Sequence, residues 1–352
     1  MVRIVAAQIP AFLLPCFRAS VLLHDTFTPT LMDLLIVEPL DGNVFQWLSA
    51  RHDVLYAPEL AGDPQGFRRA LATVRAIIIP PSVTLDARAV QAALALQVVG
   101  RLSSGSENID IDACGCRGIE VVRPATASAV AEAEFAVSAL LQMLRRVPIA
   151  NDEGLLVGRE LGSAMVGLVG MTSTAKPLAQ LLRAFGARVV GYDPGLHASD
   201  PMWERTGVHP VALGDLMQTS DCVCVLMGYF ARFRGLFGER LLGECKANQV
   251  LVSLGHSSLF DEAALAWALL SGQMSAAWFD CMEPGLLDPG RPLRRIDTLQ
   301  VTPRVAGTTQ QSRTRSAWAV ARRIDELLCT EPQGAASLVL KPALASGDFA
   351  GL

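Results

Sequence analysis

Two successive series of short aliphatic runs, separated by helix-like segments, dominate this chain. The first series comprises residues 34–38, 53–56, 76–80, 96–100 and 119–122, and the second comprises residues 165–170, 187–193, 222–227, 249–254, 276–280 and 299–303. Alternation of buried strands with helices is typical of parallel βαβ units. The sequence therefore predicts an α/β protein with two doubly wound parallel sheets.

The composition agrees with a chain that buries large cores, and it excludes some classes of function. The chain has 352 residues, of which 51% are hydrophobic and 18% charged, and this length suits two domains. A net charge of −4 provides no basic field for nucleic acid. No apolar run anywhere in the sequence reaches the roughly eighteen residues that a membrane-spanning helix needs. The eight cysteines show no C-x-x-C spacing, so we predict reduced, mostly buried thiols in a cytoplasmic protein without a metal site.

The second series opens with the layout of a dinucleotide-binding βαβ unit. In MVGLVGMTSTAKPLAQLLRAFGARVVGYDP (165–194) a strand ends at Gly170, a helix follows, and the next strand ends at Asp193. A G-x-G-x-x-G/A fingerprint falls on Gly170, Thr172 and Ala175, and Thr172 places a β-branched side chain where a pyrophosphate normally approaches the backbone. Asp193 is expected to accept the adenosine ribose hydroxyls and to repel a 2′-phosphate, which favours NAD over NADP. The alternative is that Asp193 only ends a strand.

Seven longer stretches resemble one enzyme family. They are VVGRLSSGSENIDIDAC (98–114), ATASAVAEAEFAVSALL (125–141), GRELGSAMVGLVG (158–170), SDCVCVLMGYFARFRGLFG (220–238), LVSLGHSSLFDEAAL (251–265), AAWFDCMEP (276–284) and VTPRVAGTT (301–309). In this order they resemble the D-isomer-specific 2-hydroxyacid dehydrogenases, which include phosphoglycerate, formate and D-lactate dehydrogenases. The resemblance implies NAD as the cofactor, a small acidic molecule as the ligand, and a homodimer built mainly through the nucleotide-binding domains.

The resemblance also implies a division of the chain into domains. Residues 32–146 and 306–345 would form a flavodoxin-like substrate domain, and residues 147–305 would form a Rossmann domain inserted between them. Residues 1–31 are then an N-terminal extension, and residues 346–352 a C-terminal tail. The apolar start of the extension is interrupted by polar and proline residues, which disfavours a signal peptide. The active site is expected in the cleft between the domains.

The family's catalytic groups are an arginine that holds the substrate carboxylate, a histidine that takes the hydroxyl proton, and a glutamate that orients the histidine. By this resemblance, His256 stands at the arginine position and Arg304 at the histidine position. Glu283 stands before Pro284 at the glutamate position, two residues short of the family spacing. In one interpretation, the cationic and the titrating group are exchanged between these two positions. The alternative is that Arg304 only pairs with Glu283 or another nearby acid and closes an inactive cleft.

Further departures gather around the same cleft. The loop whose amides cradle the substrate carboxylate reads LSSG (102–105), so Ser104 and Gly105 are the expected substrate-binding residues. Asp280 resembles the aspartate beside the nicotinamide amide. Phe230 stands near a position where the family often has a small hydroxyl residue that faces the cofactor.

These substitutions leave three interpretations open. The first is a divergent NAD-linked oxidoreductase for a small 2-hydroxy or 2-keto acid, in which Arg304 holds the carboxylate and His256 transfers the proton. The second is a catalytically inactive dehydrogenase-like protein that serves as a ligand sensor or partner subunit, and the third is a biosynthetic enzyme with a non-redox reaction in the same cleft. Fold alone does not decide among them. The presence of Asp193, Asp280 and the Gly170 turn together favours the first.

No chemistry is assigned to the remaining histidines and cysteines. His52, His197 and His209 lie in loop-like or helix-flanking segments, where solvated or capping roles are expected. Cys222, Cys224 and Cys281 fall on or beside predicted central strands, where packing is the expected role.

Overall fold

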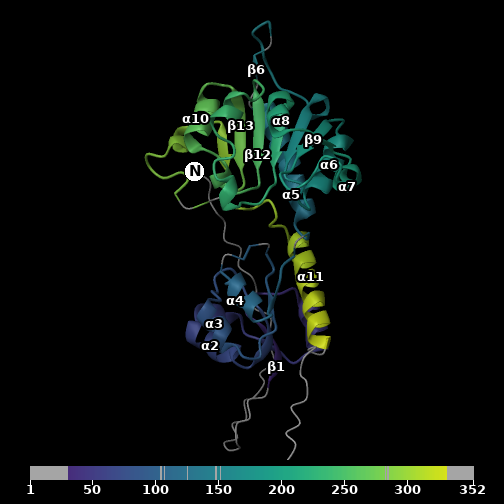
Figure 1. Cartoon of the computed structure of the whole chain (residues 1–352), viewed down its shortest axis with the longest axis vertical. Helices are drawn as coiled ribbons and strands as arrows, with labels where there is room; N and C mark the ends of the chain where they lie inside the picture. The colour runs from purple at the N-terminus through teal and green to yellow at the C-terminus, as the bar shows by residue number, and fades with distance from the viewer. Residues whose placement is uncertain are drawn as a thin grey trace, which may run out of the picture.

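The chain folds into two α/β domains, each built around a parallel sheet (Figure 1). The structure is a computed structural model that describes residues 31–330, except for residues 104, 107, 125, 147, 148, 151, 282 and 284. Almost all of the predicted N-terminal extension, and the whole predicted C-terminal tail, lie outside the described residues. Among the described residues, no helix combines the length and the apolar character needed to span a membrane.

The first domain contains a five-stranded sheet of order β2-β1-β3-β4-β5. The strands are β1 (Met32–Ile36), β2 (Val54–Tyr56), β3 (Val74–Ile78), β4 (Val98–Gly100) and β5 (Glu120–Val122), and all their pairings are parallel. This is the strand order of flavodoxin-like folds. The predicted fold class of this domain is therefore confirmed.

Helices cover both faces of this first sheet. One face packs against α2 (Pro64–Leu71), α3 (Ala87–Ala92) and α4 (Ile111–Cys116), and the other against α1 (Gly42–Ser49) and the long α11 (Gln310–Cys329). A short 3-10 turn, η1 (Pro58–Gly62), precedes α2. The helices α1 to α4 each begin after an aspartate whose carboxylate accepts a backbone N–H of the first turn, namely Asp41, Asp63, Asp86 and Asp110. Such caps define where each helix begins.

The second domain contains a seven-stranded parallel sheet of order β10-β9-β8-β11-β12-β13-β14. Its strands are β8 (Met165–Val169), β9 (Arg188–Tyr192), β10 (His209–Pro210), β11 (Cys222–Val225), β12 (Gln249–Ser253), β13 (Met274–Phe279) and β14 (Leu299–Val301). The order is that of a Rossmann fold with one further strand. All the predicted strands are present, and β10 was missed because it is only two residues long.

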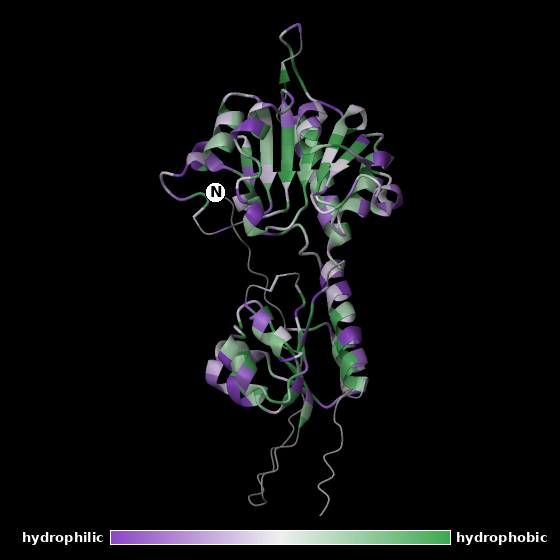
Figure 2. Cartoon of the chain, viewed as in Figure 1, coloured by the Kyte–Doolittle hydropathy of each residue, from purple (hydrophilic) through white to green (hydrophobic). Residues whose placement is uncertain are grey.

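The helices of the second domain lie on both faces of its sheet (Figure 1). They are α5 (Ala129–Arg146), α6 (Ala175–Ala184), α7 (Pro201–Thr206), α8 (Leu213–Thr219), α9 (Glu239–Gly243) and α10 (Glu262–Leu270), with 3-10 turns η2 (Leu161–Ser163), η3 (Ala231–Phe233), η4 (Ser257–Leu259) and η5 (Pro292–Arg295). The central strands are continuously hydrophobic, and their carboxyl ends point toward the first domain (Figure 2). Cys222, Cys224 and Cys281 are buried there, which agrees with their predicted packing role.

Helix α5 packs with the second domain, whereas the domain boundary expected at residue 146 would place it in the first domain. Its apolar face, including Ala136, Leu140 and Met143, packs in one core with β8, β12 and α6. By its contacts, α5 therefore belongs with the second domain rather than with residues 32–146. A helix that connects two domains has one apolar face, and the sequence does not say which core that face joins.

Candidate functional site

The turn between β8 and α6 holds Gly170 in a conformation and packing that only glycine can adopt. Gly170 has a φ of +100°, and a Cβ there would lie 2.6 Å from the backbone nitrogen of Met227. Its own N–H donates to the carbonyl of Tyr192 at 2.8 Å. Only glycine fits a position that combines positive φ with such close backbone contact. The sequence prediction for Gly170 therefore has a structural reason.

Asp193 lies beside this turn at the carboxyl end of β9. Its Oδ2 accepts from the N–H of Met171 at 2.7 Å, and its Oδ1 accepts from the N–H of Gly195 at 2.8 Å. A carboxylate offers about four acceptor positions, so these two bonds leave capacity for ribose hydroxyls. Asp193 thus does more than end a strand, because it also fixes the glycine turn.

A cavity of about 270 Å³ opens next to Asp193. It lies at the carboxyl ends of β9 and β10, and Leu196, Trp203, Pro210 and Val211 contribute apolar surface to it. At the edge of a Rossmann sheet, an apolar cavity beside the ribose-binding carboxylate suits an adenine ring. These residues fit a bound dinucleotide.

The other two fingerprint positions differ in environment. Ala175 is the first residue of α6 and is fully buried, as the close helix–sheet packing at this position demands. Thr172 is exposed, and its carbonyl accepts from the N–H of Ala175 at 3.0 Å. The residue at the middle fingerprint position is therefore solvent-accessible.

His256, Glu283 and Arg304 come from three separate segments and meet at one carboxylate. The Nε2 of His256 lies 3.5 Å from Oε1 of Glu283, and Nη2 of Arg304 lies 3.4 Å from the same oxygen. The side chain of Glu283 is only 15% exposed, whereas that of Arg304 is 57% exposed. Despite its shorter spacing, Glu283 therefore contacts both His256 and Arg304.

The imidazole of His256 is held on several sides. Its Nδ1 accepts from the N–H of Ser258 at 3.1 Å, which caps η4, and its ring stacks on Tyr229 with centroids 4.8 Å apart. Because Nδ1 accepts, the proton of the neutral ring is on Nε2, which faces Glu283. To transfer a proton to or from a substrate at Nε2, His256 would first have to leave its contact with Glu283.

Asp280 organises the loop that carries Arg304. Its Oδ1 accepts from the Oγ1 of Thr302 at 2.6 Å and from the N–H of Val305 at 2.8 Å, and its Oδ2 accepts from the N–H of Ala306 at 2.7 Å. Arg304 itself has a φ of +53°, a conformation that non-glycine residues rarely adopt. The sequence predicted a cofactor contact for Asp280, and in the structure its carboxylate holds this strained loop.

The expected substrate loop is only partly described. Ser104 lies outside the described residues, and Gly105 is half-buried. Arg101 was not among the predicted site residues. It is 2% exposed and donates to Ser103 Oγ at 2.6 Å and to the side chain of Asn108. Burial raises the pKa of nearby Glu38 above its ordinary value, although the charge of Arg101 opposes that shift. A single arginine at a strand end gave no periodic signal by which it could have been found.

Comparison with known proteins places these observations in a family. A family model described as "D-isomer specific 2-hydroxyacid dehydrogenase, NAD binding domain" matches residues 137–306. The chain belongs to this family. Its cofactor is NAD, consistent with the Gly170 turn, the Asp193 carboxylate and the adjacent cavity.

Curated relatives of this dehydrogenase-family chain differ in substrate. It is 27% identical over 327 residues to the D-3-phosphoglycerate dehydrogenase of Archaeoglobus fulgidus, covering 90% of this chain and 61% of the relative. It is 30% identical over 272 residues to the enzyme of the same name from Mycobacterium tuberculosis, covering 74% of this chain and 51% of the relative. It is 28% identical to the (S)-sulfolactate dehydrogenase of Chromohalobacter salexigens, covering 81% and 95% of the two chains. The chain thus spans between half and two thirds of the length of these two phosphoglycerate dehydrogenases.

Solved structures share the fold. The apo form of Rhodotorula graminis D-mandelate dehydrogenase superposes with a TM-score of 0.71 at 20% identity, covering 85% of this chain and 94% of the other. The NAD⁺-bound 3-phosphoglycerate dehydrogenase of Entamoeba histolytica superposes with a TM-score of 0.65 at 16% identity, covering 84% and 95%. At these identities the likeness establishes the two-domain α/β architecture.

Proposed function

We propose that this protein is a divergent NAD-linked oxidoreductase that acts on a small 2-hydroxy or 2-keto acid with exchanged catalytic residues. The observation that carries the proposal is the convergence of His256 and Arg304 on Glu283. A titrating ring and a guanidinium thus lie within 3.5 Å of the same carboxylate oxygen, which supplies an acid–base group and an anion-binding group on one side of the cleft. The intact Asp193 site supports the same conclusion, because it retains the family's cofactor geometry.

The roles follow from the chemistry of each group. Arg304 is permanently charged and carries a planar set of donors suited to a substrate carboxylate, so it is the proposed anion-binding residue. His256 is the only one of the three that can both give and take a proton near neutral pH, so it is the proposed acid–base residue. Glu283 holds the imidazole before substrate binds, and its charge balances the guanidinium. Bound NAD supplies the hydride acceptor or donor.

The direct test is reduction of a panel of 2-keto acids by the purified protein with NADH. The panel should include phosphorylated, sulfonated, aromatic and short aliphatic acids. The relatives described above are named for phosphoglycerate, sulfolactate and mandelate, which differ in the group attached to the 2-hydroxy acid. Turnover of at least one acid is the expected result. If none is reduced while NADH still binds, the inactive sensor or partner interpretation replaces this one.

Cofactor selectivity gives a second prediction. NAD(H) should bind weakly, because Thr172 removes one close backbone approach to phosphate at a cost of roughly 1–3 kcal/mol. NADP(H) should bind more weakly still, because Asp193 repels a 2′-phosphate. Calorimetric titration with each cofactor measures the two affinities. Asp193→Ala should reduce the difference between the affinity for NAD(H) and that for NADP(H). Tight NADPH binding by the wild type would contradict the prediction.

Assembly gives a third prediction, which rests on the family resemblance and on an exposed apolar arm. The antiparallel hairpin of β6 (Ile149–Ala150) and β7 (Leu156–Val157) projects from the second domain (Figure 1). Leu155 is 58% and Leu156 73% exposed, and exposed apolar surface on such an arm favours burial against a second copy. Light scattering should give a homodimer, and Leu156→Glu should shift it toward monomer. Leu94→Glu, at a leucine 81% exposed on the first domain, is the matched control.

The acid side of the stability profile gives a fourth prediction. Burial alone would raise the pKa of Glu283, but hydrogen bonds from Ser257 and the charge of His256 outweigh it and lower the pKa below the ordinary 4.5. A depressed folded-state pKa contributes stability above the unfolded value, and this contribution is lost as pH falls through the folded value. Glu283→Gln should therefore flatten the loss of stability below about pH 4.5 in urea denaturation. Glu134→Gln, at an exposed position on α5, should leave the profile unchanged.

A further inference from the structure

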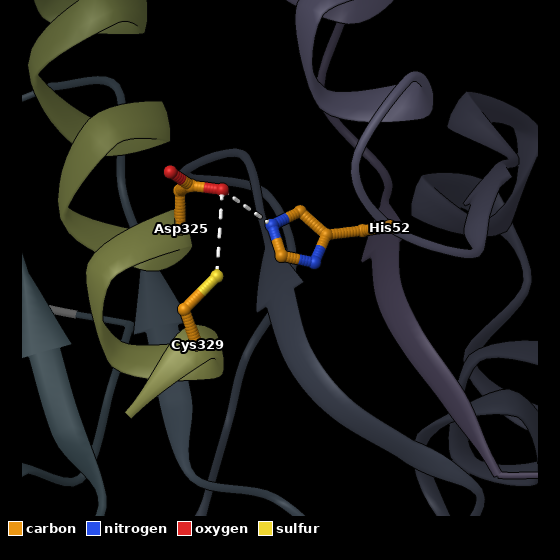
Figure 3. Close-up of side chains that lie close together, drawn as sticks. All are labelled: His52, Asp325 and Cys329. Atoms are coloured by element: carbon orange, nitrogen blue, oxygen red, sulfur yellow. Dashed lines mark hydrogen bonds and ion pairs between the residues drawn. The ribbon is translucent and has the colours of Figure 1, made fainter. Parts of the chain in front are cut away.

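A cluster with three different ligand types lies at the far end of the first domain. His52, in the turn after α1, faces Asp325 and Cys329 of α11 (Figure 3). Its Nε2 lies 2.8 Å from Oδ1 of Asp325, and the Sγ of Cys329 lies 3.9 Å from that same oxygen. The three ligand atoms all lie within 4.8 Å of one another. A solvated or capping role was expected for His52, but its side chain is only 5% exposed.

We propose that His52, Asp325 and Cys329 form a binding site for a divalent transition metal, with Zn²⁺ the best-suited ion. Imidazole nitrogen, thiolate sulfur and carboxylate oxygen are the ligands zinc takes in proteins, whereas Mg²⁺ and Ca²⁺ select oxygen ligands alone. One thiolate and one carboxylate also balance the charge of the dication. Three protein ligands leave a fourth tetrahedral position for water, and the exposed thiol lies where water reaches it.

The distances fit this coordination after small side-chain movements. Zinc lies about 2.0–2.3 Å from its ligands, so neighbouring donors of a tetrahedral site lie roughly 3.3–3.6 Å apart. The separation of 2.8 Å between His52 Nε2 and Asp325 Oδ1 is below that range, and the separation of 3.9 Å between Cys329 Sγ and the same oxygen is above it. Binding would replace the imidazole N–H and thiol S–H contacts to Asp325, and it would release the thiol proton.

The backbone that carries the ligands is already in place. Asp325 and Cys329 are four residues apart on α11, which puts both on one helix face. Trp47 of α1 packs edge-on against Trp318 of α11 with centroids 5.7 Å apart, and Arg75 donates to the carbonyl of Leu328 at 3.1 Å. The metal would therefore join two helices that already touch, and it would close a loop of 273 residues between His52 and Asp325.

This site is separate from the proposed dehydrogenase site. The loop around Arg304 leads into the amino-terminal end of α11, whereas Cys329 ends the same helix of 20 residues. A helix of that length spans on the order of 30 Å. The proposed role is accordingly to stabilise the first domain, without any part in hydride transfer.

The test is titration of the untagged, chelator-stripped full-length protein with Zn²⁺ by calorimetry, and with Co²⁺ by absorption spectroscopy. The expected result is one saturable equivalent, a thiolate-to-cobalt charge-transfer band, and a raised melting temperature with Zn²⁺. Cys329→Ser and Asp325→Asn should each weaken binding at least tenfold, and Cys329→Ser should abolish the band. Cys116→Ser, at an exposed cysteine elsewhere in the same domain, is the matched control.

Two results would overturn the proposal. One is the absence of a saturable equivalent in the wild type. The other is wild-type binding by both Cys329→Ser and Asp325→Asn. These residues lie at the surface end of α11, and the metal-free melting temperature of each variant verifies that it folds.

Discussion

Replacing His256 with alanine is expected to reduce kcat on a responsive 2-keto acid by roughly 10²–10⁴-fold, the range that a positioned acid–base group supplies. Replacing Arg304 with alanine should chiefly raise KM, because a carboxylate clamp contributes to binding before and during the reaction. Steady-state kinetics with NADH measure both effects. The different split between kcat and KM is what distinguishes the two exchanged roles.

The controls for this pair are available in the chain. Arg240→Ala removes an exposed guanidinium from α9 and should leave both constants unchanged. Glu283→Gln should lower kcat less than His256→Ala, because it removes the negative charge beside the imidazole but leaves the ring. An unaffected kcat in His256→Ala would end the exchanged-role mechanism, and so would a kcat loss in Arg304→Ala as large as that in His256→Ala.

Gly170→Ala is expected to lower the free energy of unfolding by about 2–5 kcal/mol and to abolish measurable NADH binding. The added Cβ would lie 2.6 Å from the nitrogen of Met227 and 2.7 Å from its Cα, and neither backbone atom can move aside like a flexible side chain. The estimate combines roughly 1–2 kcal/mol for the left-handed backbone with about 1–3 kcal/mol for overpacking. Urea denaturation and calorimetric titration measure the two effects.

Gly272→Ala separates the two causes. Gly272 has a φ of +77° in the same domain, but a Cβ there would meet nothing within 4 Å. This variant carries the backbone strain without the steric clash, so it should lose only about 1–2 kcal/mol and keep its NADH affinity. Equal losses in both variants would show that the close contact with Met227 has no energetic consequence.

The hydrophobic pattern of the sequence predicted the architecture well, because strand formation depends mainly on residues that are close together in the chain. The hydrophobic runs that a parallel sheet requires identified the strands of both domains, except for the two-residue β10 and the short β6 and β7. Gly170 and Asp193 were found because a strand–helix–strand unit sets their spacing along the chain, and the structure gives both a physical reason. Helix α5 has an apolar face, but the sequence did not reveal which of the two cores that face joins.

The sequence by itself determined two α/β units, their strands, the dinucleotide turn and the family. Only the tertiary structure decided that Glu283 meets both His256 and Arg304, that Asp280 holds the loop around Arg304, and that His52 pairs with Asp325. The physical reason is that strands, caps and turns are set by neighbours within a few residues, whereas these contacts depend on how separate segments pack. For His52 and Asp325 that separation is 273 residues, so no spacing rule could have linked them.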